Sequence, residues 1–387
     1  MPTRINVNIT QINGYHLRFK PAEPLGNART FIRERNFLAL EVKTDAGLSG
    51  WGEVFSSPWA AAALIQRQMA KEVINRSPLD HGVIYARLLG SIGYDKRGAS
   101  MMAISALDMA MHDLAARAQN ISVAQLLGGV VRDALPCYAS GPFIREGADP
   151  YAHYERDIER YLKQGFKAVK PRAGISPRAD AKMAERVRSS IGDDLEFMID
   201  INQGYSSAAA SQAVQMIEHT RPLWVEEPVH PEDLEGYQRV ANATTIPIAG
   251  GEALGSLASF NAFIASGAPT VLQPDLTVCG GFTGYRKAAA LAEAREICAM
   301  PHAFGTGINF CASLQMAAAT PTRHYGLSAP YPWVEYDPTG NPLIELCDIS
   351  LDSNGLITLP PGPGLGLELS PDHLTPWIVE HWSVNSP

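Results

Sequence analysis

Three acidic residues are evenly spaced along the middle of the chain, with Glu226 midway between Asp200 and Glu252. Each lies at or just past the end of a short apolar run, so the spacing predicts one carboxylate at the end of each of three successive strands. Carboxylates gathered at one height repel one another unless a cation lies among them. Ligands that offer only oxygen favour a hard ion, and three carboxylates with open positions suit octahedral Mg²⁺. A lone aspartate in such a place would more often be a helix cap or a turn residue.

An aspartate and a histidine follow at nearly the same interval. Asp275 and His302 end the next two apolar runs, so adjacent strands would place their side chains next to each other. The carboxylate can then accept a hydrogen bond from one imidazole nitrogen and raise the basicity of the other. An isolated histidine would be assigned to the core, but this partner and the facing metal site favour an acid/base group.

Two cations precede the carboxylates. Lys170 and Arg172 alternate along one strand, so both side chains should point to the same interior. They could be structural ion pairs with the carboxylates. The functional interpretation is that they hold a substrate anion and stabilise charge that develops during the reaction.

The elements that must position these residues recur regularly from residue 133 onward. Helical, Ala-rich stretches such as 179–190, 207–219 and 286–296 separate short apolar runs, and each unit has the length of a strand, a helix and two loops. The runs are 135–139, 168–169, 195–199, 223–225, 246–249, 270–272, 297–300 and 333–334. Eight such units predict a parallel (β/α)8 barrel of the α/β class rather than an open sheet.

The first third of the chain predicts a small α+β domain. Apolar residues alternate over 38–42, and a turn at 45–47 leads to a second strand at 48–51. Between residues 99 and 118 the apolar residues change to helical spacing, which predicts an amphipathic helix. Past residue 345 the regular pattern ends in a loop-forming tail rich in proline and glycine.

Composition excludes several classes of protein. The 387 residues are 46% hydrophobic and 19% charged, which is unlike a disordered or coiled-coil chain. A formal charge of −8 without a basic block argues against nucleic acid as a partner. No apolar run is long enough to span a membrane, and residues 1–6 lack the apolar run of a signal peptide. Five scattered cysteines predict reduced thiols in a cytoplasmic protein.

With these residues in place, the chain resembles the enolase superfamily in its mandelate racemase branch. The resemblance covers nearly the whole chain and rests on several motifs taken together. They are Lys170-Pro-Arg172, Asp200-Ile-Asn202-Gln-Gly, Trp224-Val-Glu-Glu-Pro228, Ala249-Gly-Gly-Glu252, Gln273-Pro-Asp275, Pro301-His-Ala-Phe-Gly-Thr-Gly307 and Trp333-Val-Glu335. The family members most similar to it act on sugar acids, as dehydratases or as cycloisomerases of lactones and anhydro sugar acids.

The resemblance implies a three-part architecture. Residues 1–132 would form an N-terminal α+β capping domain, and residues 133–344 a modified (β/α)8 barrel that carries the catalytic site. Residues 345–387 would return to the cap. The resemblance also implies a homo-oligomer that acts on a small-molecule carboxylate. Substrate identity would lie mainly in the capping loops around residues 16–35 and 53–60.

The resemblance further implies a role for each singled-out residue. Asp200, Glu226 and Glu252 match the Mg²⁺ ligands, and the pair of Asp275 and His302 matches the family's acid/base dyad. On the substrate side, Glu335 matches the acid that hydrogen-bonds the substrate carboxylate, Asn202 matches a substrate contact, and Lys170 matches the first lysine of a Lys-x-Lys motif. Arg172 departs from that motif, because an arginine stays protonated and is a poor base.

The departure at Arg172 leaves His302 as the principal acid/base. The function expected is Mg²⁺-dependent removal of the proton next to a carboxylate, giving an ene-diolate, followed by β-elimination from a sugar acid or its lactone. A racemase or epimerase of a 2-hydroxy or amino acid derivative, with Lys170 as the opposing base, is the alternative within the family. Outside the family, the chain could be a glycoside hydrolase or a non-catalytic sugar-binding protein. An activity that depends on a metal would exclude the first, and any turnover of a sugar acid would exclude the second.

Overall fold

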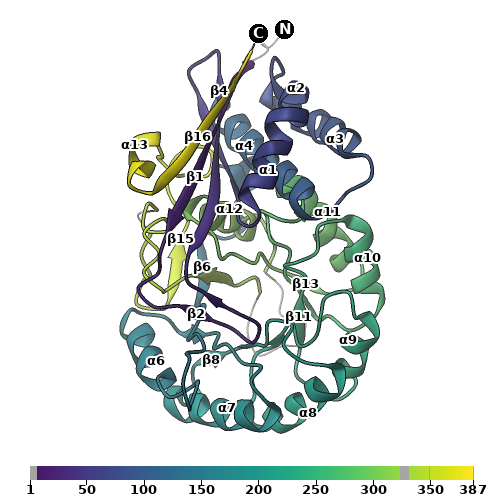
Figure 1. The fold of residues 1–387 in the computed structure, drawn as a ribbon, viewed down its shortest axis with the longest axis vertical. Coiled ribbons are helices and arrows are strands. Elements are labelled where there is room, and N and C mark those ends of the chain that lie inside the picture. Colours follow the sequence, from purple (N-terminus) through teal and green to yellow (C-terminus); the bar gives the residue numbers. More distant parts are fainter. Residues whose placement is uncertain (1–6, 323–330, 348, 387) are drawn as a thin grey trace.

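The upper part of the molecule is built on a four-stranded antiparallel sheet (Figure 1). The computed structural model describes residues 7–322, 331–347 and 349–386, so residues 1–6, which lack a signal-peptide pattern, lie outside it. β4 (Arg35–Thr44) and β5 (Ser49–Val54) form the predicted hairpin. β1 (Ile9–Phe19) pairs with β4 on one side and with β16 (Ile378–Asn385) on the other, which gives the order β16-β1-β4-β5. The last strand of the chain therefore lies in the first sheet.

The long helix predicted at 99–118 is α4 (Gly98–Ala118), and it is not amphipathic in its setting. Nearly every residue from Ser100 to Ala116 is buried, because β5 covers one side of the helix and α11 (Gly281–Glu293) of the lower part packs against it as well. A Cβ at Gly52 of β5 would overlap the carbonyl oxygen of Ala106. The strand and the helix therefore approach backbone to backbone, which only glycine permits.

The lower part contains eight parallel strand segments where the sequence predicts them. They are β6 (Ala134–Ala139), β7 (Ala168–Val169), β8 with β9 (Glu196–Phe197 and Ile199–Asp200), β10 (Val225–Glu226), β11 (Ile248–Gly250), β12 (Val271–Leu272), β13 (Cys298–Ala299) and β14 (Val334–Tyr336). Parallel pairing runs β14-β6-β7-β8 and β9-β10-β11-β12-β13, with only Met198 between β8 and β9. This is the strand order of a (β/α)8 barrel.

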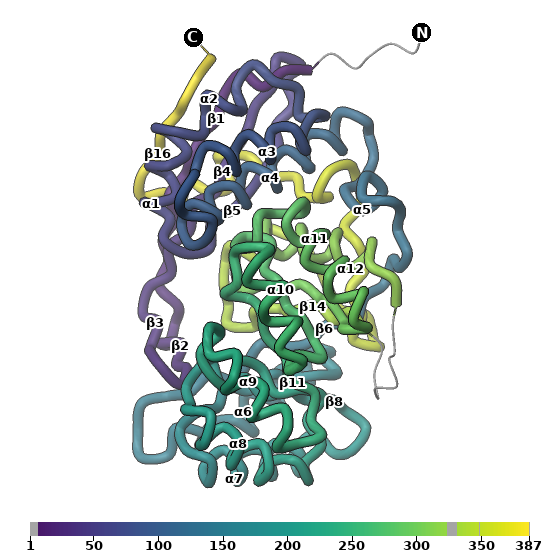
Figure 2. The backbone as a smooth tube through the Cα atoms, turned by 90° about the vertical axis from the view of Figure 1, so that its right-hand side faces the viewer, coloured from purple at the N-terminus to yellow at the C-terminus, as the bar shows by residue number. Residues whose placement is uncertain are grey.

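Helices cover the outside of these strands (Figures 1 and 2). The stretches predicted at 179–190, 207–219 and 286–296 correspond to α7 (Pro177–Ile191), α8 (Ser207–Ile217) and α11. The others are α6 (Tyr154–Lys163), α9 (Leu234–Ala241), α10 (Leu257–Ala265) and α12 (Gly307–Ala318). None of the described helices is both long and apolar enough to cross a bilayer.

A small hairpin links the upper part to the strand ends of the barrel. β2 (Leu25–Gly26) and β3 (Phe31–Ile32) extend downward from the cap sheet (Figures 1 and 2), and Gly26 forms a bridge with Ile144 of the barrel.

Two further helices of the cap, α1 (Pro58–Leu64) and α3 (His81–Ile92), pack on α4. The exact boundaries of the domains stay a prediction.

Large side chains fill the space between the barrel strands. Trp224, Tyr138, Met198 and Met300 belong to one cluster of fully buried residues contributed by strands around the barrel. Of these, Trp224 also donates a hydrogen bond from Nε1 to Oε2 of Glu226, at 2.9 Å. The polar site described next therefore begins directly at this apolar packing.

Candidate active site

The carboxylates predicted from the sequence lie at the carboxyl ends of consecutive strands. Asp200 and Glu226 end β9 and β10 and are paired in register, and Glu252 follows β11. Asp275 and His302 form a further parallel bridge just past β12 and β13. The barrel geometry thus collects all five side chains at one end.

The side chains of His302 and Asp275 are in direct contact. His302 Nδ1 lies 2.6 Å from Oδ2 of Asp275. The other oxygen of Asp275 accepts from Thr277 N at 2.6 Å and from its Oγ1 at 2.7 Å, which fixes the carboxylate. His302 Nε2 is left facing Glu252 at 3.2 Å and Glu335 at 3.6 Å. One nitrogen is therefore held while the other points toward the carboxylates of the site.

The surroundings of His302 favour its charged form. Burial alone would lower the pKa of the imidazole, but Glu252, Glu335 and the hydrogen bond to Asp275 together raise the pKa to about 10. This shift favours the doubly protonated ring, a form that suits proton donation. A cation bound to Glu252 would offset one of the charges that raise this pKa.

Lys170 is fully buried among carboxylates. Its Nζ lies 2.5 Å from Oε1 of Glu226, 2.9 Å from Oε1 of Glu335 and 4.0 Å from Oδ2 of Asp200. All of these ionic contacts join it to acidic residues of the site. The ammonium group of Lys170 therefore neutralises part of the negative charge of these carboxylates.

Arg172 lies beside Lys170 and is paired with Asp200. Its Nη2 donates to Ser140 Oγ at 2.8 Å, and the guanidinium lies 5.0 Å from the ring centre of Phe143 and 5.7 Å from that of Phe304. Aromatic faces on a guanidinium hold it in one orientation and exclude water. Arg172 is thus a rigid, partly caged cation.

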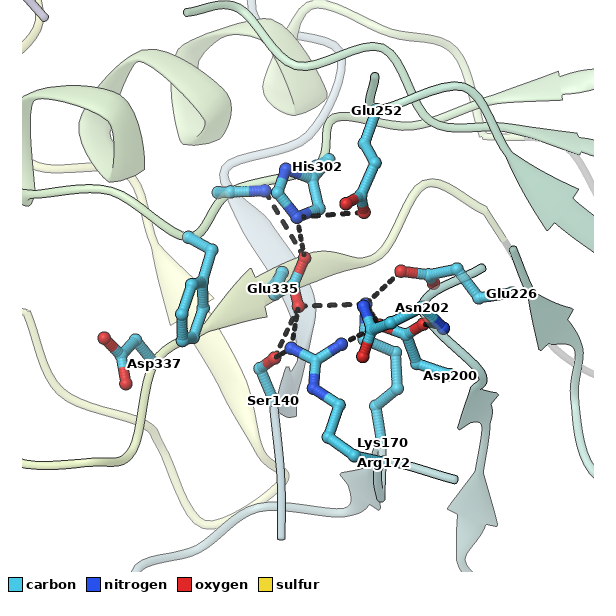
Figure 3. A network of polar contacts seen from close by, with 12 residues as sticks. Ser140, Lys170, Arg172, Asp200, Asn202, Glu226, Glu252, His302, Glu335 and Asp337 are labelled. Atoms are coloured by element: carbon cyan, nitrogen blue, oxygen red, sulfur yellow. Dashed lines mark hydrogen bonds and ion pairs between the residues drawn. The ribbon is translucent and has the colours of Figure 1, made fainter. Parts of the chain in front are cut away.

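Glu335 joins the two halves of the site. Figure 3 shows its carboxylate between His302 on one side and Lys170 with Arg172 on the other. Ser140 Oγ donates to Oε1 of Glu335 at 2.5 Å. Burial would raise the pKa of Glu335, but Lys170, His302 and Arg172 outweigh it and lower that pKa well below the usual range. Glu335 is therefore ionised.

Asn202 orients the first of the metal-ligand candidates. Its backbone N donates to Oδ1 of Asp200 at 2.7 Å, and its Nδ2 donates to Oδ2 at 3.0 Å. The residue has a positive φ of 46°, which asparagine tolerates better than most residues. Its Oδ1 atom is buried and accepts no hydrogen bond from the described residues. This oxygen is free to accept a bond from a ligand.

The charge balance of the site fits a divalent cation. Six carboxyl groups face three cationic groups, so the site would carry an excess of three negative charges with every acid ionised; the acids are Asp200, Glu226, Glu227, Glu252, Asp275 and Glu335, and the cations are Lys170, Arg172 and His302. Burial and then the charge of Glu252 raise the pKa of Glu227, and its Oε1 has no hydrogen-bond partner in the described part of the chain. An uncompensated buried carboxylate is costly without a cation.

The three candidate ligands do not yet converge on one point. Within the described residues no group of three acidic, histidine or cysteine side chains is arranged to hold a metal. Lys170 and Arg172 contact Glu226 and Asp200, and His302 contacts Glu252. Oxygen donors and charge suit Mg²⁺, and a cation bound to Asp200 would displace the pair of Arg172 and Asp200.

Several residues of the site were not predicted from the sequence. Ser140 bridges Glu335 and Arg172, and Gln273 Nε2 donates to Oε2 of Glu226 at 2.7 Å. Glu227, which follows the predicted ligand Glu226, is buried as well. Gln273 and Glu227 stand inside quoted motifs, which is the signal that could have found them. A lone serine after a strand carries no such signal.

The predicted capping loop around residues 16–35 reaches the barrel. Arg29 Nη1 donates to Oε1 of Gln203 at 2.7 Å, and Gln203 Nε2 donates to Glu227 at 2.8 Å. The Cβ of Ala28 lies so close to Gly174 and Gly204 that a side chain at either glycine would overlap it. Elsewhere in the two predicted loops, Arg18 and Arg33 pair with Glu34 and Glu146, and Trp59 stacks on His16.

The chain is similar in sequence to known families of enzymes. Residues 13–128 match the family profile described as the mandelate racemase / muconate lactonizing enzyme N-terminal domain, and residues 153–373 match the profile described as enolase C-terminal domain-like. The chain is 32% identical to a D-galactarolactone cycloisomerase of Agrobacterium fabrum over 375 residues, which is 95% of this chain and 98% of that protein.

Two solved structures share the fold over nearly the whole length. The 3,6-anhydro-D-galactonate cycloisomerase of Zobellia galactanivorans is 29% identical, with a TM-score of 0.86 over 96% of this chain and 100% of that one. The L-talarate dehydratase of a Polaromonas species, in complex with Mg and L-glucarate, is 27% identical, with a TM-score of 0.85 over 99% of this chain and 100% of that one.

Proposed function

Because this chain belongs to the mandelate racemase and muconate lactonizing enzyme family of the enolase superfamily, we propose that it removes the proton next to the carboxylate of a sugar acid and then eliminates the β-oxygen. The single observation that carries the proposal is the position of His302 Nε2. The opposite ring nitrogen is tied to Asp275, and Nε2 faces the carboxylates at the strand ends. The chain is thus an enzyme of the lyase or isomerase type found among its relatives.

We infer that Asp200, Glu226 and Glu252 hold Mg²⁺. Three oxygen ligands from successive strands and the excess of negative charge support this assignment. When bound, Mg²⁺ supplies positive charge that stabilises the substrate carboxylate and its enolised form. Solved relatives contain magnesium. The assignment of the three ligands in this chain is part of the proposal.

The remaining steps belong to side chains of this protein. His302 in its neutral form accepts the α-proton at Nε2, while Asp275 holds Nδ1–H and stabilises the imidazolium that results. The same proton can then pass from Nε2 to the departing β-oxygen. The C–H and C–O bonds break and a carbon–carbon double bond forms. The proton ends on water, which leaves, or on the hydroxyl of the opened ring, which stays on the product. Arg172 and Lys170 bind anionic oxygens of the substrate.

Dehydration and cycloisomerisation share this chemistry and differ in the leaving oxygen. A β-hydroxyl leaves as water, whereas a ring oxygen stays attached to the product. Relatives named as galactarolactone and anhydrogalactonate cycloisomerases and as galactonate dehydratases support a sugar acid or its lactone as substrate. Mass spectrometry of the product distinguishes loss of water from conservation of mass.

Epimerisation is the second candidate, because Lys170 and His302 lie on opposite sides of Glu335 (Figure 3). A racemase needs a base on each face of the carbon, and Lys170 is the residue placed to be the second. Its contacts with Glu226 and Glu335 oppose this, because they stabilise the ammonium form. An epimerised product of unchanged mass and connectivity would favour this candidate.

The test is incubation of the protein with Mg²⁺ in D₂O and a panel of galactarolactone, galactonate, anhydrogalactonate and talarate, followed by ¹H NMR. We expect consumption of at least one acid, no reaction in excess chelator, and no deuterium at the α-carbon with His302→Asn. His219→Asn is the matched control, because His219 lies at the surface beside Glu185. Full α-exchange by His302→Asn would overturn the role of His302, and an unreactive panel would overturn the substrate class.

A homo-oligomeric assembly and a cytoplasmic location stay predictions. Light scattering on the purified chain measures the assembly directly. Fractionation of cells that express the natural protein measures the location.

A further inference from the structure

The loop that follows His302 is held by a carboxylate from the cap. Glu53 lies near the end of β5, and its side chain is completely buried against the start of α12. Its two carboxylate oxygens accept from Thr306 N at 3.0 and 3.1 Å. Oε2 also accepts from Thr306 Oγ1 at 2.6 Å and from Asn309 N at 3.0 Å. A residue of the first domain thus binds the backbone of the second, four positions beyond His302.

These donors are the ones that a helix leaves unpaired at its start. The first turn of α12 exposes N–H groups and the positive end of the helix dipole, and an acidic side chain stabilises both. In most helices that side chain comes from the helix itself. Here Thr306 is the N-cap residue, and its hydroxyl oxygen accepts from Ile308 N. Glu53 accepts from the N–H groups of Thr306 and Asn309, which this local cap does not bind.

The approach of Glu53 depends on a glycine. A Cβ at Gly305 would overlap Oε1 of Glu53. The φ of Gly305 is not in the left-handed region, so the backbone conformation does not require glycine here. The glycine is needed because a side chain would occupy the position of the Glu53 carboxylate. The loop is therefore shaped to admit the carboxylate.

Two further bonds hold the adjacent residues of the same loop. Arg35 of β4 donates to the carbonyl oxygen of Phe304 and pairs with Asp337 at 2.5 Å. Asn341 Nδ2 donates to the carbonyl oxygen of Gly305 at 2.9 Å. Consecutive residues 304, 305 and 306 are thus fixed from outside the loop, and two of the three anchors are cap residues. The loop begins at His302.

We propose that Glu53 is a positioning residue, which sets the place of His302 by anchoring the loop between it and α12. The inference rests on the proposed function, since it concerns the proton transfer by His302. A displacement of about 1 Å at a reacting group can cost about 100-fold in rate. Nε2 of His302 is held relative to Glu252 and Glu335 by the bond to Asp275, by the backbone bond from His302 N to the carbonyl oxygen of Pro274, and by this loop.

The anchor uses two oxygen acceptors at the end of one side chain. Both oxygens of Glu53 accept from N–H or O–H groups. In Glu53→Gln one oxygen becomes an NH₂ group, which would face the donors of Thr306. The substitution keeps size and removes the anchor. Glu41 on β4 gives the matched control, because it is also buried but accepts only from cap residues, Asn13, Tyr15 and Ser49.

The first measurement needs no substrate. Hydrogen exchange of the peptide 301–310, read by mass spectrometry, should become at least about tenfold faster in Glu53→Gln, because local opening exposes the amides of Thr306 and Asn309. It should be unchanged in Glu41→Gln. Equal exchange in wild type and Glu53→Gln would overturn the anchor, whatever the activity of the enzyme. If Glu53→Gln does not fold, Thr306→Val removes the hydroxyl donor and is measured in the same way.

The second measurement concerns catalysis. We expect kcat of Glu53→Gln to fall by roughly 10- to 100-fold with KM within about twofold, because the acid/base moves while the binding cations stay. In the His302→Asn background the same substitution should cost little more. An unchanged kcat, an equal loss in Glu41→Gln, or a full additional loss beside His302→Asn would each overturn the positioning role. If wild type turns over no sugar acid, the proposed function fails, and the exchange result still decides whether Glu53 is the anchor.

Discussion

The guanidinium of Arg172 is ion-paired with Asp200, which we propose as the first magnesium ligand. A cation and an arginine cannot both neutralise the same carboxylate at full strength. Arg172 also contacts Ser140 and lies near the rings of Phe143 and Phe304. These contacts would remain if Asp200 bound a metal ion instead of Arg172. The arginine at this position therefore links metal binding to the part of the site that binds the substrate.

Replacement of Arg172 by methionine should make stability more dependent on Mg²⁺. Without metal, Asp200 would lose its nearest cation and keep Lys170 at 4.0 Å, and breaking a buried pair costs about 3–5 kcal/mol. Added Mg²⁺ should restore most of this loss, because it takes over the charge of Asp200 and has no arginine to displace. Thermal unfolding with and without Mg²⁺ measures the effect, and the rise in Tm should be larger in the variant than in wild type.

Arg188→Met is the control for this prediction. Arg188 lies near the end of α7 and donates to the carbonyl oxygens of Thr220 and Leu195, which precede the strands that end in Glu226 and Asp200, so its loss should lower Tm without changing the Mg²⁺ increment. An equal Mg²⁺ increment in wild type and Arg172→Met would show that the ion does not compete for Asp200.

The capping loop should loosen when Gly204 is replaced by alanine. A Cβ there would overlap that of Ala28, so the loop must move away from the barrel. Gly204 is the better position than Gly174, because Gly174 has a φ of 103° and any side chain there is strained as well. Trypsin cleavage after Arg29 and Arg33 should become several-fold faster, and KM for the acid should rise.

A second substitution checks the cause. Ala28→Gly removes the atom that Gly204→Ala would meet, so the double variant should regain most of the protease resistance. Ala28→Gly alone serves as the reference for the added backbone freedom. If the double variant is cleaved as fast as Gly204→Ala, the contact between the loop and residue 204 is not what holds the loop closed.

Much of the fold could be predicted because its signals are local. The eight apolar runs correspond to β6 through β14, since buried parallel strands are short and continuous in apolar residues. The burial of α4 on nearly all sides was not predictable in the same way. It arises from α11, which lies far along the chain and packs against α4 through bonds such as Thr283 to Asp108.

The candidate site also has features that could be predicted from the sequence and contacts that could not. Equal spacing was enough to group Asp200, Glu226 and Glu252 at one edge, because each barrel unit uses a similar length of chain. Spacing could not show that Lys170 and Arg172 contact these acids in the absence of a metal. The anchor from Glu53 to Thr306 joins residues 253 positions apart and leaves no local pattern.

Asp108 is expected to be important for the joint between the cap and the barrel. It accepts from Thr283 N at 3.0 Å and Oγ1 at 2.6 Å, and lies 3.3 Å from the ring of His112. Asp108→Ala leaves these buried donors unsatisfied and should lower the free energy of unfolding by about 2–4 kcal/mol. Urea unfolding measures the change. Asp193→Ala, at an exposed pair with Arg221, should stay within about 0.5 kcal/mol of wild type.

Glu53 should give the protein a specific pH dependence of stability. Burial raises the pKa of its carboxyl to about 7, against the lowering effect of Thr306 and Asn309. The folded chain therefore binds this proton more tightly than the unfolded chain does. The stabilisation is complete below the unfolded pKa of about 4.5 and is lost as the pH rises through about 7, to a total of up to about 3 kcal/mol.

Glu53→Gln lacks this titration, and the comparison with wild type isolates it from the other acids of the site. Urea unfolding of both proteins at pH 5 and pH 8 measures the effect. The stability of wild type relative to Glu53→Gln should fall between the two values, because only the wild type must ionise a buried carboxyl as the pH rises. A difference that stays constant, or that grows with pH, would show that Glu53 is already ionised at pH 5. Its three donors, Thr306 N, Thr306 Oγ1 and Asn309 N, would then outweigh its burial, and the carboxylate would hold the His302 loop at pH 5 as well.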